Sequence, residues 1–235
     1  GPLKRRQTEE RKPCRQENID MQKVPSKDQK KVPETSVIPV SELRKHWKYE
    51  KIEGGGVRIL GYKGAETQVV VPSKIGKEPV KEIGHHAFSP DASYLTSEIR
   101  ERRKHLVSIA IPKGVVKIGA GAFCNCSNLA EIILPEGLKQ IGFIDLNWIT
   151  GMQGVFCNCK SLTHVTIPKS VTKIGNCTFC GCTALVSLTF LGKSVNISIF
   201  ADIDLHNSPS LTIYAPAGSS AEECAEKYHI PFIAE

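Results

Sequence analysis

Three closely spaced cysteine pairs are the residues of this chain best suited to chemistry. Each pair follows a phenylalanine, as "FCNC" at 123–126, "FCNC" at 156–159 and "FCGC" at 179–182. Cysteine thiolates bind zinc, and a thiolate beside a histidine can act as a nucleophile. Zinc sites are usually built from two C-x-x-C pairs, whereas each pair here is C-x-C. The spacing argues against a metal site, and we expect no metal and no cofactor.

Motifs of enzymes are missing from the chain. The seven histidines fall in no H-x-x-x-H or H-E-x-x-H pattern, and neither G-x-S-x-G nor G-x-x-x-x-G-K-[ST] occurs. We therefore predict no catalytic residues and no enzymatic activity. The cysteines number nine, which is odd, and their spacing is unlike that of stapled secreted proteins. Free thiols and the absence of a recognisable signal peptide favour the cytoplasm, with a secreted or cell-surface location as the alternative.

The cysteine pairs recur because the sequence around them recurs. Units with the pattern L-x-x-I-x-I-P-x-x-V-x-x-I-G-x-x-A-F-x-x-C start at Leu106, Leu129 and Leu162, and a degenerate unit starts at Leu185. The first and last intervals are 23 residues, and the middle one is 33 because of an insertion at 143–152. Periods of this length are typical of solenoids.

Each part of the repeat predicts a local structure. The alternating I-x-I predicts a short strand, the following proline ends it, and the glycine indicates a turn. One coil cannot enclose its own apolar face, so stacked coils must share a core. We predict a mostly β, α/β solenoid, a right-handed coil with parallel short strands. Equivalent positions then form structural columns of Phe123, Phe156 and Phe179, of Cys124, Cys157 and Cys180, and of Cys126, Cys159 and Cys182.

The recurring "IP", "IG", "AF" and "C" resemble the BspA-like leucine-rich repeat family, which is bacterial and protist, over about residues 46–235. The resemblance implies an arc that binds a protein or a host surface, possessing adhesin-like rather than enzymatic activity. It also implies an N-terminal β-hairpin cap and a C-terminal cap of a helix and a strand. The expected boundaries are a cap at 46–66, a first repeat with an insertion at 67–105, repeats at 106–128, 129–161, 162–184 and 185–210, and a cap at 211–235.

The N-terminal segment differs in composition from the repeats. Residues 1–51 contain 14 Lys or Arg and 8 Asp or Glu, against a net charge of +7 for the whole chain. Residues 1–45 have few large apolar side chains, so we predict a basic, mostly disordered linker or tail. Nucleic-acid binding by this tail is the alternative function, but its acids and its lack of aromatic residues argue against it. No apolar run is long enough to span a membrane.

Two surfaces are candidates for partner binding. Outward positions of the first strands form a small, nearly neutral row that suits a protein or peptide better than nucleic acid, with plain solvated positions as the alternative. These positions are Ser108, Ala110, Glu131, Ile133, His164, Thr166, Ser187 and Thr189. The insertion at 89–105 predicts a protruding helical arm, capped by Ser97, whose basic residues Arg100, Arg102, Arg103 and Lys104 point largely to solvent. We expect a monomer.

Overall fold

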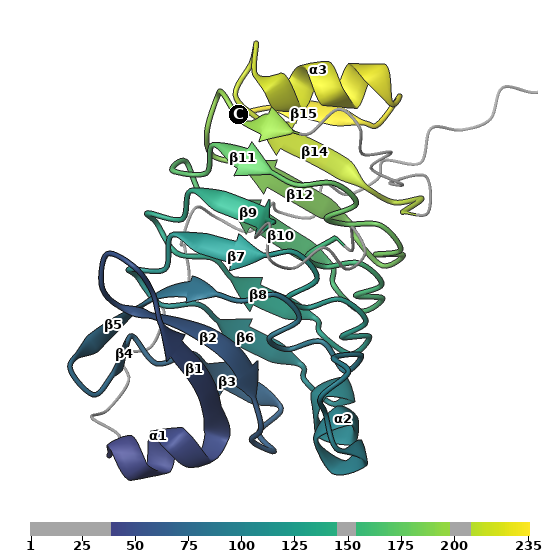
Figure 1. The fold of residues 1–235 in the computed structure, drawn as a ribbon. Helices are drawn as coiled ribbons and strands as arrows, with labels where there is room; N and C mark the ends of the chain where they lie inside the picture. The colour runs from purple at the N-terminus through teal and green to yellow at the C-terminus, as the bar shows by residue number, and fades with distance from the viewer. Residues whose placement is uncertain (1–38, 145–153, 198–207) are drawn as a thin grey trace, which may run out of the picture. The chain divides into compact units, whose positions relative to one another are not determined.

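The computed structural model of the chain describes residues 39–144, 154–197 and 208–235 (Figure 1). All of them lie in one compact unit, Lys31–Glu235. Most of the expected tail and most of the insertion at 143–152 lie outside the described residues.

The last residues of the expected tail are folded. Helix α1 spans Val40–His46, and its Leu43 is buried in the same apolar cluster as Trp47 of the following strand. The predicted boundary at residue 45 is therefore wrong for residues 40–45. A single leucine in a polar stretch was too weak a signal to predict this short helix.

The I-x-I strands form one side of every coil. They make a seven-stranded sheet in the order β15-β14-β12-β10-β8-β6-β3, with parallel pairing throughout. Its strands are β3 (Gln68–Val70), β6 (Ser108–Ala110), β8 (Glu131–Ile133), β10 (His164–Ile167), β12 (Ser187–Phe190), β14 (Thr212–Ala215) and β15 (Phe232–Ala234). The mostly β solenoid with parallel short strands is confirmed.

The second short run of each repeat, V-x-x-I-G, also forms a strand, which the sequence analysis did not predict. These strands, β5 to β13, continue a sheet that begins with the N-terminal hairpin, in the order β1-β2-β5-β7-β9-β11-β13, and β4 (Lys74–Ile75) pairs with β5. The strands are β1 (Trp47–Lys51), β2 (Val57–Tyr62), β5 (Glu78–Ile83), β7 (Lys117–Gly119), β9 (Gln140–Phe143), β11 (Lys173–Ile174) and β13 (Asn196–Ile197). Strands β1 and β2 form the antiparallel hairpin at the N-terminal end.

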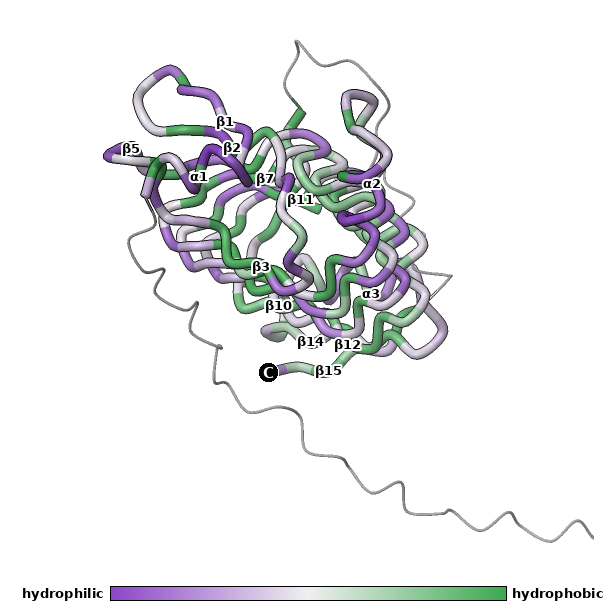
Figure 2. The backbone as a smooth tube through the Cα atoms, turned by 90° about the horizontal axis from the view of Figure 1, so that it is seen from below, coloured by the Kyte–Doolittle hydropathy of each residue, from purple (hydrophilic) through white to green (hydrophobic). Residues whose placement is uncertain are grey.

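The third side of the described coils is a turn, and three of these turns carry the cysteine motif. Figure 2 views the backbone from below, so that the coils lie one behind another and the apolar (green) stretches recur from coil to coil. Two more helices flank the coils: α2 (Ser97–Lys104) leaves the turn of the first repeat, and α3 (Ser220–Lys227) covers the C-terminal end with β15 (Figure 1).

A column of aromatic rings runs through the core. Phe88, Phe123, Phe156 and Phe179 stack with centroid separations of 5.0, 5.5 and 5.5 Å and interplanar angles of 11–18°. Tyr62 and Trp47 of the hairpin continue the column beyond Phe88. The four phenylalanines are at most 3% exposed. Because equivalent positions stack at the strand spacing, one phenylalanine per coil is enough to build a continuous aromatic column within the aliphatic core.

The repeated glycine is needed for space more than for a turn. Gly84, Gly119 and Gly175 have ordinary φ angles, and only Gly142 has a positive one (86°). A Cβ on Gly119 would lie 2.8 Å from the backbone nitrogen of His85, and one on Gly175 would lie 2.7 Å from the Gly142 carbonyl oxygen. The second strands of neighbouring coils therefore approach more closely than any side chain allows. The expected turn does begin at Gly119, whose carbonyl accepts from the Ala122 backbone N–H at 3.2 Å, but glycine is needed there for space rather than for a positive φ angle.

Candidate functional site

Two rows of side chains cross the outer face of the first sheet. Parallel pairing places Ser108 opposite Glu131, Glu131 opposite His164, and His164 opposite Ser187. The first row comprises Gln68, Ser108, Glu131, His164, Ser187 and Thr212, and the second comprises Val70, Ala110, Ile133, Thr166, Thr189 and Tyr214. We call these twelve residues the strand face. The structure therefore brings all eight sequence-predicted face residues together.

One predicted member of the strand face is not available to a partner. Ala110 is only 6% exposed, although its side chain is on the outer side of the strand. It pairs with Val70 on one side and Ile133 on the other, and these larger side chains cover its single methyl group. The expectation that Ala110 is exposed is wrong, since alternation predicts the direction of a side chain but not the size of its neighbours.

The strand face is polar, small and nearly uncharged. Its two rows contain one carboxylate, on Glu131, and no lysine or arginine. His164 and Thr166 are exposed, and the Nδ1 atom of His164 lies 2.7 Å from the Ser187 hydroxyl. A surface without a basic stripe suits a protein or peptide rather than a phosphate backbone.

Sequence reasoning missed four members of this surface. Gln68, Val70, Thr212 and Tyr214 belong to the first and last units, where the repeat pattern is degenerate. The signal that identifies them is the proline that follows an alternating run, as in "VVVP" at 69–72 and "IYAP" at 213–216.

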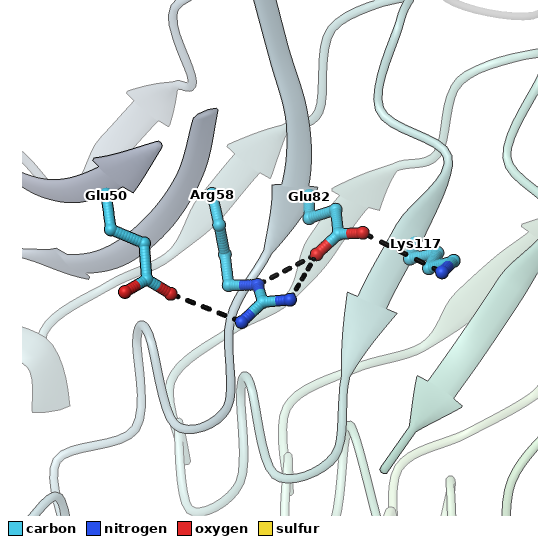
Figure 3. Close-up of polar contacts among 4 residues, drawn as sticks. All are labelled: Glu50, Arg58, Glu82 and Lys117. Carbon is cyan, nitrogen blue, oxygen red and sulfur yellow. Dashed lines mark hydrogen bonds and ion pairs between the residues drawn. The ribbon is translucent and has the colours of Figure 1, made fainter. Parts of the chain in front are cut away.

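The outer face of the second sheet carries a cluster of paired charges. Arg58 donates through Nε to Glu82 at 2.8 Å and through Nη1 to Glu50 at 3.2 Å, while Lys117 lies 3.8 Å from Glu82 (Figure 3). Arg58 and Lys117 both lie over the ring of Phe143. Two cations and two carboxylates balance one another, so this cluster stabilises the sheet surface rather than offering a basic patch to nucleic acid.

The insertion at 89–105 contains the expected helix, α2. Its N-cap is Thr96, whose hydroxyl accepts from the Ile99 backbone N–H, rather than Ser97 as predicted. Both residues can cap a helix, so the sequence alone did not decide which of the two neighbours takes the N-cap position.

The basic residues of the expected arm are engaged in hydrogen bonds and ion pairs, and Arg103 is buried. Arg103 is 3% exposed, and its guanidinium donates to the backbone carbonyls of Tyr62 (3.0 Å), His86 (3.2 Å) and Ser89 (2.8 Å). The prediction that Arg103 points to solvent is wrong, because these carbonyls need a donor at the junction of hairpin and turn.

The other three basic residues of the arm are also engaged. Arg100 donates to the Pro90 carbonyl and Arg102 to the Lys63 carbonyl, and both are half-buried. Lys104 is exposed but lies 2.6 Å from Glu101 of the same helix. The four cations therefore do not form the free solvent-facing patch that the sequence suggested.

Cys126, Cys159 and Cys182 form an inner column. All three are fully buried, and their thiols donate to the carbonyls of Phe88 (3.3 Å), Phe123 (3.2 Å) and Phe156 (3.1 Å) of the preceding coil. Burial raises the pKa of Cys126 and of Cys182 to about 12. These thiols form hydrogen bonds between consecutive coils, and they remain protonated at neutral pH.

The residue between the two cysteines explains the rest of the motif. Asn125 and Asn158 have positive φ angles of 63° and 59°, and Gly181 has 72° at the equivalent position. Asn158 donates from its side chain to the Asn125 side-chain oxygen at 2.8 Å, and Asn125 donates in turn to the Asp91 carboxylate. Asparagine tolerates this left-handed conformation and also forms a hydrogen-bonded ladder, so "FCNC" is a turn motif.

Two general features of the described ranges bear on function. No group of three or more His, Cys, Asp or Glu side chains in the described part of the chain is arranged to hold a metal ion. Within the same ranges, no helix combines the length and the apolar character that crossing a bilayer requires.

The repeats match a known family. The model of the BspA type leucine-rich repeat region matches residues 101–144 and 152–215 in six copies. No curated protein matches the chain significantly.

Solved structures with this architecture are similar to the chain. A leucine-rich repeat protein of T. pallidum is 29% identical, with a TM-score of 0.56, over 72% of this chain and 69% of that one. A leucine-rich cell surface protein of Faecalibacterium prausnitzii A2-165 is 25% identical, with a TM-score of 0.56, over 76% of this chain. The match spans only 40% of that second protein.

Proposed function

Because the repeats of this chain belong to the BspA-type leucine-rich repeat family, we propose that the chain is a non-enzymatic module that binds a protein or peptide through its strand face. The observation that carries the proposal is the register of the first sheet. Pairing through β3, β6, β8, β10, β12 and β14 lines up two continuous rows of side chains across six coils. Solenoids use extended surfaces of this kind for binding.

The chemistry of the strand face favours a protein partner. Its hydroxyl, amide and imidazole groups can hydrogen-bond to a partner's polar groups, and tyrosine, present as Tyr214, is enriched at protein interfaces. Ile133 and Tyr214 are half-buried and add apolar contact area to the second row. Arg58 of the opposite sheet and Arg102 and Lys104 of α2 are paired with carboxylates, which argues against nucleic acid as the partner of the solenoid.

An adhesin-like role is the finer form of this proposal. It is supported by the similarity to a protein described as a leucine-rich cell surface protein, of which this chain matches 40%. The partner would then be a protein of another cell.

Substitution on the strand face tests the proposal. Thr166 is exposed in β10, and Asn196 is exposed in β13 of the opposite sheet. Thr166→Arg places a large cation within the proposed interface, and Asn196→Arg is the matched control with the same added charge.

Partner capture is compared by quantitative mass spectrometry for the whole chain and both variants. The proposal expects proteins captured by the wild type to be lost at least about tenfold, equivalent to roughly 1.4 kcal/mol, with Thr166→Arg and retained with Asn196→Arg. Equal capture by all three chains would contradict it. Both variants must melt like the wild type for the comparison to be valid.

A further inference from the structure

The first cysteines of the three motifs form an outer column, whose thiols have different partners from those of the inner column. Cys124, Cys157 and Cys180 occupy the first cysteine position of the three turns. Backbone hydrogen bonds from Phe123 to Val155 (2.9 Å) and from Asn125 to Cys157 (2.8 Å) hold the first two turns in register. In-register neighbours at strand spacing fall within the range of Cα separations that a disulfide spans, about 4.4–6.8 Å.

The side chains of Cys124 and Cys157 are in direct contact. The Cys124 thiol hydrogen-bonds to the Cys157 sulfur, whereas the inner thiols donate to phenylalanine carbonyls. Cys124 is 1% exposed and Cys157 is half-buried. One sulfur of the pair can therefore meet a small solute while the other is shielded behind it.

The two thiols also differ in acidity. The hydrogen bond from Cys124 lowers the pKa of Cys157 to about 7, while the same contact and burial raise the pKa of Cys124. Thiolates, not thiols, are the nucleophiles, so the half-buried member of the pair is the reactive one. A low-pKa, partly accessible thiolate next to a second thiol is the arrangement found in cysteines that are oxidised reversibly.

We propose that Cys157 and Cys124 are a reversible oxidation site that closes a disulfide between adjacent coils when the protein meets a hydroperoxide. The Cys157 thiolate attacks one oxygen of hydrogen peroxide, the O–O bond breaks, and the hydroxide that leaves takes up a proton to become water. The resulting sulfenic acid is attacked by the Cys124 sulfur. An S–S bond forms, the S–O bond breaks, and the hydroxyl leaves with the Cys124 proton as a second water. Two thiols and one peroxide give one disulfide and two waters, and a dithiol restores the reduced pair.

This site is independent of the proposed binding function. The cysteine turns form the third side of the coil, and the strand face is on the first sheet, so neither reduced nor oxidised sulfur contacts the twelve residues of the strand face. Linking two coils restricts the unfolded chain, so oxidation is expected to raise the melting temperature.

Peptide mapping of the whole chain tests the proposal. The reduced protein is freed of reductant, treated with a few equivalents of hydrogen peroxide, blocked with a maleimide under denaturing conditions and digested with trypsin. We expect a crosslinked pair of peptides, 118–139 with 140–160, and fragmentation must place the bond between Cys124 and Cys157. Dithiothreitol should remove it.

Three serine variants identify the role of each sulfur. Cys157→Ser should reduce the crosslink at least tenfold. Cys124→Ser should leave Cys157 as a sulfenic acid that dimedone labels. Cys180→Ser, in the same column and also half-buried, should leave the crosslink unchanged and is the matched control.

Several results would overturn the assignment. A bond from Cys157 to Cys180, bonds spread among all the cysteines, or no crosslink in the folded wild type would each contradict it. If a serine variant fails to melt cooperatively, the reactivity of the wild type decides: Cys157 must be alkylated by iodoacetamide at neutral pH at least tenfold faster than Cys126 or Cys182.

Discussion

Replacing Phe156 with alanine is the sharpest test of the stacked core. Its ring is fully buried and lies between two others, 5.5 Å from the centroid of Phe123 and 5.5 Å from that of Phe179. Truncating a buried phenylalanine costs about 3–5 kcal/mol of unfolding free energy. Each stacked pair adds about 0.5–1.5 kcal/mol, so the loss of two pairs puts Phe156→Ala at the upper end of that range.

Phe179→Ala provides an internal comparison. Among the described residues its ring stacks on one phenylalanine rather than two. We therefore expect its loss of unfolding free energy to be smaller by about 1 kcal/mol, the value of one stacked pair. An exposed control is Val186→Ala, whose side chain is 42% exposed and whose loss should stay within about 0.5 kcal/mol.

Urea unfolding of the whole chain, followed by far-UV circular dichroism and by tryptophan fluorescence, measures all three variants. The two probes must give the same midpoint, since a repeat protein can unfold in stages. A loss below about 1 kcal/mol for Phe156→Ala, the size typical of surface sites, would refute the stacked-column reasoning.

Four further outcomes are expected. Arg103→Ala should lower the unfolding free energy by about 3 kcal/mol, because it removes the guanidinium from the Tyr62 and Ser89 carbonyls and leaves the His86 carbonyl with only the Ser89 backbone N–H. Lys104→Ala should change it by less than about 0.5 kcal/mol, and chemical denaturation measures both. Gly175→Ala should cost about 1–3 kcal/mol by the same assay, because its Cβ would lie 2.7 Å from a backbone oxygen of the neighbouring coil. Elemental analysis with thiol counting under denaturation should find no stoichiometric zinc, and one zinc per chain whose removal unfolds the protein would contradict the turn interpretation of "FCNC". The alkylation rate of Cys157 should rise from pH 6 to pH 8 with a midpoint near its pKa of about 7, because the lowered pKa makes the thiolate appear as pH increases; a midpoint above pH 8.5 would contradict the hydrogen bond from Cys124.

The sequence by itself was enough to establish the solenoid. Fixed intervals between leucine, proline, glycine and phenylalanine specify which residues are equivalent, and equivalent residues of stacked coils must be neighbours. The aromatic column, the alignment of Ser108, Glu131 and His164, and the two cysteine columns all follow from this one argument. The sequence analysis failed at the two ends of the array. Helix α1 and the end members of the two rows of the strand face (Gln68, Val70, Thr212 and Tyr214) carry too little of the repeat pattern to be identified.

Only the tertiary structure decided what each equivalent position does. The period places Cys124 and Cys126 in columns, but burial and the nearest acceptor make one thiol inert and bring the other into contact with Cys157. The repeated glycine predicted a turn, but the reason that glycine is needed there is a close approach between coils, which depends on distances across the stack. Arg103 looked like surface charge because its partners, the carbonyls of Tyr62, His86 and Ser89, are remote in sequence and have no side-chain signature. The repeat period predicts which residues are neighbours. The exposed fraction, the pKa and the hydrogen-bond partners of each residue depend on the three-dimensional positions and sizes of those neighbours.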